Sequence, residues 1–181
     1  AEGSKVTLGS EGDDAGGVII AAEVRAHESI TVYGGDAGGL GFELKATGAF
    51  ETRTGDITFD LGAGGEIVGA LRALGDGAAL NLSADGLLQI SGDLTADAAI
   101  TLSGGADEAG DAVLFNPSGT ANLASDGGRI EISGRGDVVI DGRVAHETAA
   151  LADLSIHSSE GTVEIAEGGG YIETAAQVDL R

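Results

Sequence analysis

Residues 80–90 read Leu80-Asn-Leu-Ser-Ala-Asp-Gly-Leu-Leu-Gln-Ile90, which is an apolar-polar alternation, a turn with glycine, and a second alternation. Two later stretches repeat this order: Ala121-Asn-Leu-Ala-Ser-Asp-Gly-Gly-Arg-Ile-Glu-Ile132 and Leu154-Ser-Ile-His-Ser-Ser-Glu-Gly-Thr-Val-Glu-Ile165. Alternation with a period of two residues predicts a β-strand with one apolar face. Three copies of the pattern predict a repeat protein built from short strands and turns.

A shorter word of three residues, with apolar ends and a polar middle, recurs along the whole chain. Its copies are Val6-Thr7-Leu8, Ile30-Thr31-Val32, Ile57-Thr58-Phe59, Leu88-Gln89-Ile90, Ile100-Thr101-Leu102, Ile130-Glu131-Ile132 and Val163-Glu164-Ile165. A turn with glycine and a polar residue precedes most copies, because glycine accepts a positive φ and Asp or Ser caps the turn. The irregular spacing predicts six to eight coils of roughly 20 to 30 residues, each adding about 4.8 Å along an axis.

Composition favours a thin core over a large globular one. Glycine contributes 33 of the 181 residues, whereas Trp, Met and Cys are absent and only six residues are aromatic. The interior is therefore expected to consist mainly of Ala, Val, Ile and Leu, stacked coil on coil. We expect an all-β fold, a parallel β-solenoid, and the alternative is an adhesin-type β-sandwich with antiparallel strand pairs. The lack of cysteine excludes a disulfide scaffold and a thiolate metal site.

The composition and repeat pattern stay similar along the chain, which predicts a single unit over residues 1–181, excised or processed from a larger secreted protein. Two stretches carry weak helical patterns, 67–74 (IVGALRAL) and 146–154 (HETAALADL). Both are too short to form stable isolated helices, and the first reads equally well as a strand with a bend at Gly69.

The charge of the chain limits its partners. Thirty acidic and nine basic residues yield a formal net charge of −21. Nucleic acid and anionic membrane surfaces both require basic protein surfaces, so neither is an expected partner. No apolar run reaches the roughly 20 residues that span a bilayer, so we expect no membrane insertion. Salt or divalent cations would screen the repulsion between copies.

Gly-Asp words followed by strands carry a family resemblance: Gly55-Asp-Ile-Thr-Phe59, Gly92-Asp-Leu-Thr-Ala96 and Gly136-Asp-Val-Val-Ile140. Together with the Ala/Gly/Thr-rich strands, these words give nearly the whole chain the repeat pattern and composition of another group of proteins. In this respect the chain resembles the filamentous-haemagglutinin-like large exoproteins and related giant bacterial repeat adhesins. The resemblance implies a secreted, elongated, right-handed parallel β-helix with adhesive, biofilm or surface-layer roles. It carries over no catalytic residue, and the irregular repeat and strong acidity depart from the family pattern.

Acidic-glycine loops follow several strand words and supply the candidate metal ligands. Calcium is the candidate ion, because hard cations prefer several oxygen ligands. The loops match neither the G-G-x-G-x-D nonapeptide nor an EF-hand loop, so we prefer to interpret them as solvated turns. The candidate calcium ligands are Asp13, Asp14, Asp36, Asp107, Glu108 and Asp111.

Other motifs predict structure rather than chemistry. Arg135-Gly136-Asp137 spells the integrin-binding tripeptide, but its Gly-Asp pair sits in the turn word of this chain. His27, His146 and His157 lack metal-ligand spacing, and Asp153, Ser155 and His157 share one predicted strand without the directions that a triad needs. The glycine clusters do not match a nucleotide-binding loop.

The sequence has repeats but no recognisable set of catalytic residues. This predicts a non-catalytic structural or adhesive module of a large secreted or cell-surface bacterial protein. It would act as a spacer, fibre or surface-layer building block. Its expected partners are other copies or neighbouring repeats, stacked end to end through exposed strand edges. Surface glycans and host receptors are further candidates. The alternative is a polysaccharide-active β-helix lyase or hydrolase, which the scarcity of aromatic and basic sugar contacts disfavours.

Overall fold

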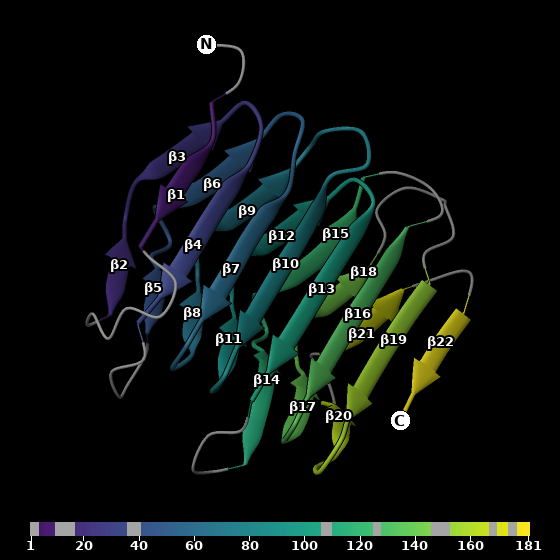
Figure 1. Ribbon diagram of the computed structural model, residues 1–181. Helices are drawn as coiled ribbons and strands as arrows, with labels where there is room; N and C mark the ends of the chain where they lie inside the picture. Colours follow the sequence, from purple (N-terminus) through teal and green to yellow (C-terminus); the bar gives the residue numbers. More distant parts are fainter. Residues whose placement is uncertain are drawn as a thin grey trace.

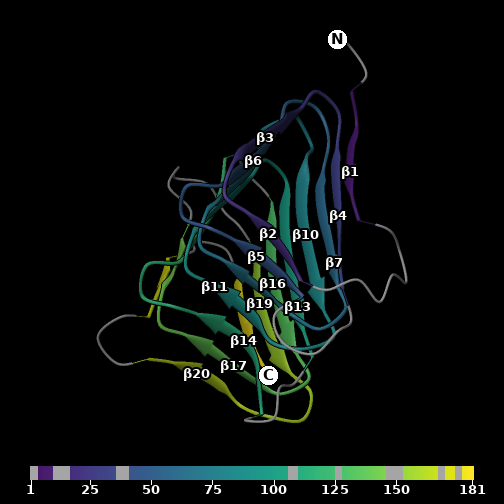
Figure 2. The ribbon, with the colours of Figure 1, turned by 90° about the vertical axis from the view of Figure 1, so that its left-hand side faces the viewer.

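A computed structural model describes residues 4–9, 17–35, 41–105, 110–124, 128–145, 153–166, 170–173 and 177–181. These residues form short strands joined by corners and contain no helix. All pairings are parallel, and the strands assemble into three sheets that wind around a common axis (Figures 1 and 2). The fold is therefore a parallel β-solenoid. The β-sandwich alternative is wrong, because it requires antiparallel pairs.

Among the described residues, seven successive coils each contribute one strand to each sheet, in the order A, B, C along the chain, and β22 then adds an eighth strand to sheet A. Sheet A consists of β1 (Val6–Leu8), β4 (Ile30–Gly34), β7 (Ile57–Leu61), β10 (Ala79–Ala84), β13 (Ala99–Gly104), β16 (Arg129–Gly134), β19 (Asp153–Ser158) and β22 (Gln177–Leu180). Sheet B consists of β2 (Val18–Ile20), β5 (Phe42–Leu44), β8 (Gly65–Ile67), β11 (Leu88–Ile90), β14 (Asp111–Phe115), β17 (Asp137–Ile140) and β20 (Val163–Ile165). Sheet C consists of β3 (Glu23–Ala26), β6 (Ala49–Thr52), β9 (Ala70–Ala73), β12 (Asp93–Ala96), β15 (Thr120–Leu123), β18 (Arg143–Ala145) and β21 (Tyr171–Glu173).

The predicted range of coil lengths is confirmed. Leu80 lies beside Ile100, and Ile100 lies beside Ile130, so coils of 20 and 30 residues stack without a change of register in sheet A. The corners absorb the difference in length.

The strand words are distributed over more than one sheet, which the sequence did not reveal. Leu88-Gln89-Ile90 and Val163-Glu164-Ile165 lie in sheet B, whereas the other five copies lie in sheet A. The same holds for the Gly-Asp words, which lie at the start of β7 in sheet A, of β12 in sheet C and of β17 in sheet B. One turn chemistry thus serves all three corners of the coil.

The period-two pattern places the apolar residues inside. In β10, Leu80 and Leu82 are buried, while Asn81 and Ser83 face outward. The inward residues of the central coils form one continuous hydrophobic core along the axis.

The stretch 67–74 forms strands with a bend rather than a helix. β8 ends at Ile67 and β9 begins at Ala70, with Gly69 in the bend. Most of the second helical candidate, 146–152, lies outside the described residues.

Phenylalanine adds to the expected aliphatic core. Phe42, Phe50 and Phe59 come from sheets B, C and A respectively, and all three are fully buried. Their ring centroids lie 5.1 Å apart for Phe42 and Phe59, 5.4 Å for Phe50 and Phe59, and 6.4 Å for Phe42 and Phe50. The tilted and edge-on arrangement of these rings is the favoured one for aromatic pairs. This phenylalanine cluster joins all three sheets at one level of the solenoid.

A column of glycines lines the corner between sheets B and C. Six consecutive coils place a glycine immediately before the sheet C strand, namely Gly48, Gly69, Gly92, Gly119, Gly142 and Gly170. The backbones approach so closely that a Cβ atom on Gly92 would lie 1.9 Å from the Gly69 carbonyl oxygen. On Gly69, a Cβ atom would lie 2.2 Å from the Gly48 carbonyl oxygen. Any larger residue in this glycine column would push successive coils apart.

Candidate functional site

Most of the candidate calcium ligands lie outside the described residues: Asp13, Asp14, Asp36, Asp107 and Glu108. Asp111 begins β14 and pairs in register with Asp137 of β17. Over the parts of the chain that the structure describes, no group of three or more His, Asp or Glu side chains lies close enough together to hold a metal ion. Calcium binding by the acidic-glycine loops stays a prediction.

Arg135 and Gly136 of the Arg-Gly-Asp tripeptide form the corner between β16 and β17, as expected for a turn, and Asp137 begins β17. The Arg135 Nε atom lies 3.3 Å from Oε1 of Glu160. The Asp137 carboxylate accepts hydrogen bonds from the Thr162 backbone N–H, at 2.6 Å, and from the Thr162 hydroxyl, at 3.0 Å. Both side chains are thus directed to the next coil rather than displayed on a free tip.

Removal of the Asp137 carboxylate is expected to cost about 1 kcal/mol of unfolding free energy, because two hydrogen bonds between coils are lost. Urea unfolding of Asp137→Ala measures this cost. Arg135→Ala is the control and is expected to change stability very little, since both partners of its ion pair are well exposed. Equal effects of the two variants would show that the Asp137 contacts do not hold the corner.

The histidines take structural or surface positions. His27 lies at the corner between β3 and β4, where its backbone N–H donates to the Ser4 hydroxyl at 3.2 Å. His157 is exposed on the outer face of β19, together with Asp153 and Ser155. These three side chains alternate along one strand, as predicted, and make no triad. His146 lies outside the described residues.

The outer face of sheet A carries a row of hydroxyl and amide groups that sequence reasoning missed. The middle residues of successive strands lie side by side in register, and they are Thr7, Thr31, Thr58, Asn81 and Thr101. We refer to these five residues as the threonine column. Within the described part of the chain, their side chains make no hydrogen bond. By contrast, the Ser83 hydroxyl on the same face donates to the Phe59 carbonyl oxygen at 3.2 Å.

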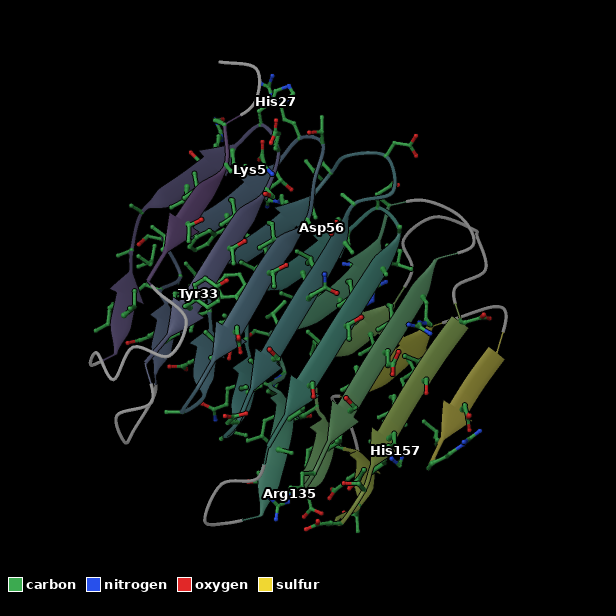
Figure 3. All side chains as sticks on the ribbon, in the orientation of Figure 1. Lys5, His27, Tyr33, Asp56, Arg135 and His157 are labelled. Carbon is green, nitrogen blue, oxygen red and sulfur yellow. The ribbon has the colours of Figure 1, made fainter. Side chains whose placement is uncertain are left out.

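A shallow depression of about 540 Å³ adjoins the threonine column where the sheet A strands begin. Lys5 Nζ lies 3.8 Å from Oε2 of Glu28, and both side chains remain substantially exposed. Asp56 Oδ1 accepts a hydrogen bond of 2.8 Å from the Ala79 backbone N–H. Figure 3 shows Lys5 and Asp56 at this end of the sheet. The lining residues are Lys5, Glu28, Ser29, Thr31, Thr54, Gly55, Asp56 and Thr58.

A second depression, of about 400 Å³, follows the glycine column on the corner between sheets B and C. Small residues line most of it, with Arg72 and Asp93 as its charged members. Its floor is the close-packed backbone described above. This geometry explains the depression as the hollow left by residues without side chains.

No family model, curated protein or solved structure matches the chain. The class of protein therefore rests on the fold, which is a parallel β-solenoid. None of the described segments forms a helix that is long and apolar enough to cross a membrane.

Proposed function

We propose that the chain is a non-catalytic structural and adhesive module of a large secreted or cell-surface bacterial protein. In this role the solenoid acts as a spacer or fibre building block and stacks end to end on another solenoid. The observation that carries the proposal concerns β1 and β22, the two outer strands of sheet A. Among the described residues, their apolar side chains are less buried than those of the central coils, and each strand pairs on one side only. The resemblance to filamentous-haemagglutinin-like exoproteins supports the same role.

Apolar side chains at both ends of the solenoid are less buried than those of the central coils. Val6 and Leu8 of β1 are only partly buried, whereas Ile100 and Leu102 of β13 are fully buried. At the other end, Leu180 is 47% exposed, although its register partner Ile156 is fully buried. A further coil on either end would bury these side chains as the internal coils do.

The backbone polarity of sheet A makes its two ends complementary. The N–H groups of inward residues point toward the following coil, as in Val6 to Ser29 O at 3.0 Å and Ile30 to Asp56 O at 3.1 Å. Consecutive residues of a parallel strand direct their groups to opposite sides. Thr7 therefore directs its N–H and C=O away from β4, and Leu180 directs its groups away from β19. Head-to-tail stacking would continue the internal ladder.

The Thr7→Pro variant tests the stacking. Proline removes the N–H at the free edge and leaves the Val6 bond to β4 intact, so the fold is expected to persist. In sedimentation velocity at high salt and calcium, where the charge of the protein is screened, we expect the sedimentation coefficient of the wild-type protein to rise with protein concentration. Thr7→Pro is expected to stay monomeric, and Thr7→Val, which keeps the N–H, to behave as the wild type.

The same experiment contains the result that contradicts the proposal. A wild-type protein that stays monomeric at every concentration in high salt and calcium does not stack. If Thr7→Pro associates as strongly as the wild type, the contact between copies does not involve the β1 edge.

A further inference from the structure

We propose that the outer face of β1, β4 and β7 binds an uncharged polysaccharide chain, with the depression beside Lys5 and Asp56 as its centre. This inference deepens the adhesive part of the proposed function by naming a ligand class and a face. It does not depend on end-to-end stacking, because stacking uses the strand edges and leaves this face free.

The depression offers the chemistry that recognises sugar hydroxyls, each of which both donates and accepts hydrogen bonds. The Lys5 ammonium donates, the Glu28 and Asp56 carboxylates accept, and the hydroxyls of Thr31 and Thr58 do either. Asp56 holds one hydrogen bond through Oδ1 and retains the acceptor capacity of its other oxygen. The polar groups are close enough together to line one continuous surface.

The threonine hydroxyls are available to a ligand. The side chains of Thr31 and Thr58 make no hydrogen bond within the described residues, so their hydroxyls can pair with solvent or with a ligand. A ligand that replaces this water with its own hydroxyls leaves no polar group unpaired, which is the condition for favourable polar recognition. Other hydroxyls near this face are already engaged, as in Thr54, which donates to the His27 carbonyl oxygen at 2.8 Å.

The register of sheet A favours a polymer over a single sugar. Thr7, Thr31 and Thr58 stand on adjacent strands in register, and neighbouring strands lie about 4.8 Å apart. The sugar units of an extended polysaccharide repeat at a comparable spacing, so successive units meet equivalent hydroxyls. The column continues to Asn81 and Thr101. The rigidity of the stacked strands holds the groups in place before the ligand arrives.

An aromatic ring and the charge of the face refine the ligand class. Tyr33 lies on the outer face of β4, two residues after Thr31, and is half-buried. It lies outside the depression, farther along the strand from Lys5 and Asp56 (Figure 3). Its ring supplies an apolar surface for the C–H groups of a sugar. The net charge of −21, with Asp60 beside Tyr33 in register, disfavours polyanions. The face therefore fits an uncharged chain better than a polyanion.

Affinity gel electrophoresis with soluble polymers tests this inference. The probes are hydroxyethyl cellulose, laminarin and dextran as neutral polysaccharides, and heparin as a polyanion. We expect at least one neutral polymer to retard the wild-type protein and heparin to leave it unretarded. In the double variant Thr31→Val with Thr58→Val, the affinity is expected to fall about tenfold, because each hydroxyl contributes one hydrogen bond.

Thr95→Val on sheet C is the matched control, since Thr95 also faces outward from a central strand. It is expected to bind as the wild type does, and thermal unfolding of both variants checks that the fold is kept. The inference is overturned if no neutral polymer retards the protein, if only heparin does, or if the double variant binds unchanged. Sedimentation of the double variant reports stacking separately, so failure of saccharide binding is distinguishable from failure of the stacking proposal.

Discussion

Phe59→Ala is expected to lower the free energy of unfolding by about 4 kcal/mol, the largest effect that a single truncation in this core should have. Phe59 is fully buried and contacts Phe42 and Phe50, which come from the other two sheets. Truncation removes apolar burial and both ring contacts, and the close-packed coils leave little room to fill the cavity. Urea unfolding followed by circular dichroism measures the change.

Tyr33→Ala is the control for this prediction, because it removes a ring of similar size from the outer face of the adjacent strand. Its expected cost is about 1 kcal/mol or less. Coils of a solenoid contact mainly their neighbours, so hydrogen exchange in Phe59→Ala should rise in β4 to β8 and remain low in β13 to β17. Equal destabilisation by both variants would contradict the importance of the phenylalanine cluster.

Gly92→Ala is expected to cost about 3 kcal/mol, although it adds only one methyl group. The new Cβ atom would lie 1.9 Å from the Gly69 carbonyl oxygen and 2.7 Å from that of Val68. Both obstacles are backbone atoms, so relief requires two coils to separate at the corner between sheets B and C. The midpoint of thermal unfolding and the urea midpoint should both fall.

Gly77→Ala provides the comparison for this prediction. Gly77 has a φ of 75°, and a Cβ atom there would have no heavy atom within 4 Å. Alanine at this position should cost about 1 kcal/mol from backbone strain alone. If Gly92→Ala proves no more costly than Gly77→Ala, the glycine column is not required for the stacking of coils.

The sequence predicted the strands and the solenoid because both follow from local pattern. Ile57-Thr-Phe59 reads as a half-buried strand in any setting, and the turn before it requires only Gly55 and Asp56. It did not predict which sheet each strand joins, because the Gly-Asp word lies at the start of strands of all three sheets. The glycine column was missed for a related reason, since its members align only after the coils are stacked.

The candidate site was less accessible to sequence reasoning than the fold. Thr7, Thr31 and Thr58 are the polar middle residues of three strand words, but their alignment depends on coils of unequal length. Asn81 belongs to none of the three-residue words and joins them only through register. The depression also requires Lys5, Glu28 and Asp56 from three different coils to meet at one corner. Such proximity depends on register, which composition and spacing do not specify.

The unequal coils have a practical consequence for engineering. Because coils of 20 and 30 residues share one register in sheet A, extra residues at a corner leave the ladder undisturbed. Foreign peptides grafted at corners would therefore be carried at heights set by coil number, in increments of about 4.8 Å. The solenoid would serve as a molecular ruler for positioning epitopes, enzymes or binding loops at defined separations along one rod.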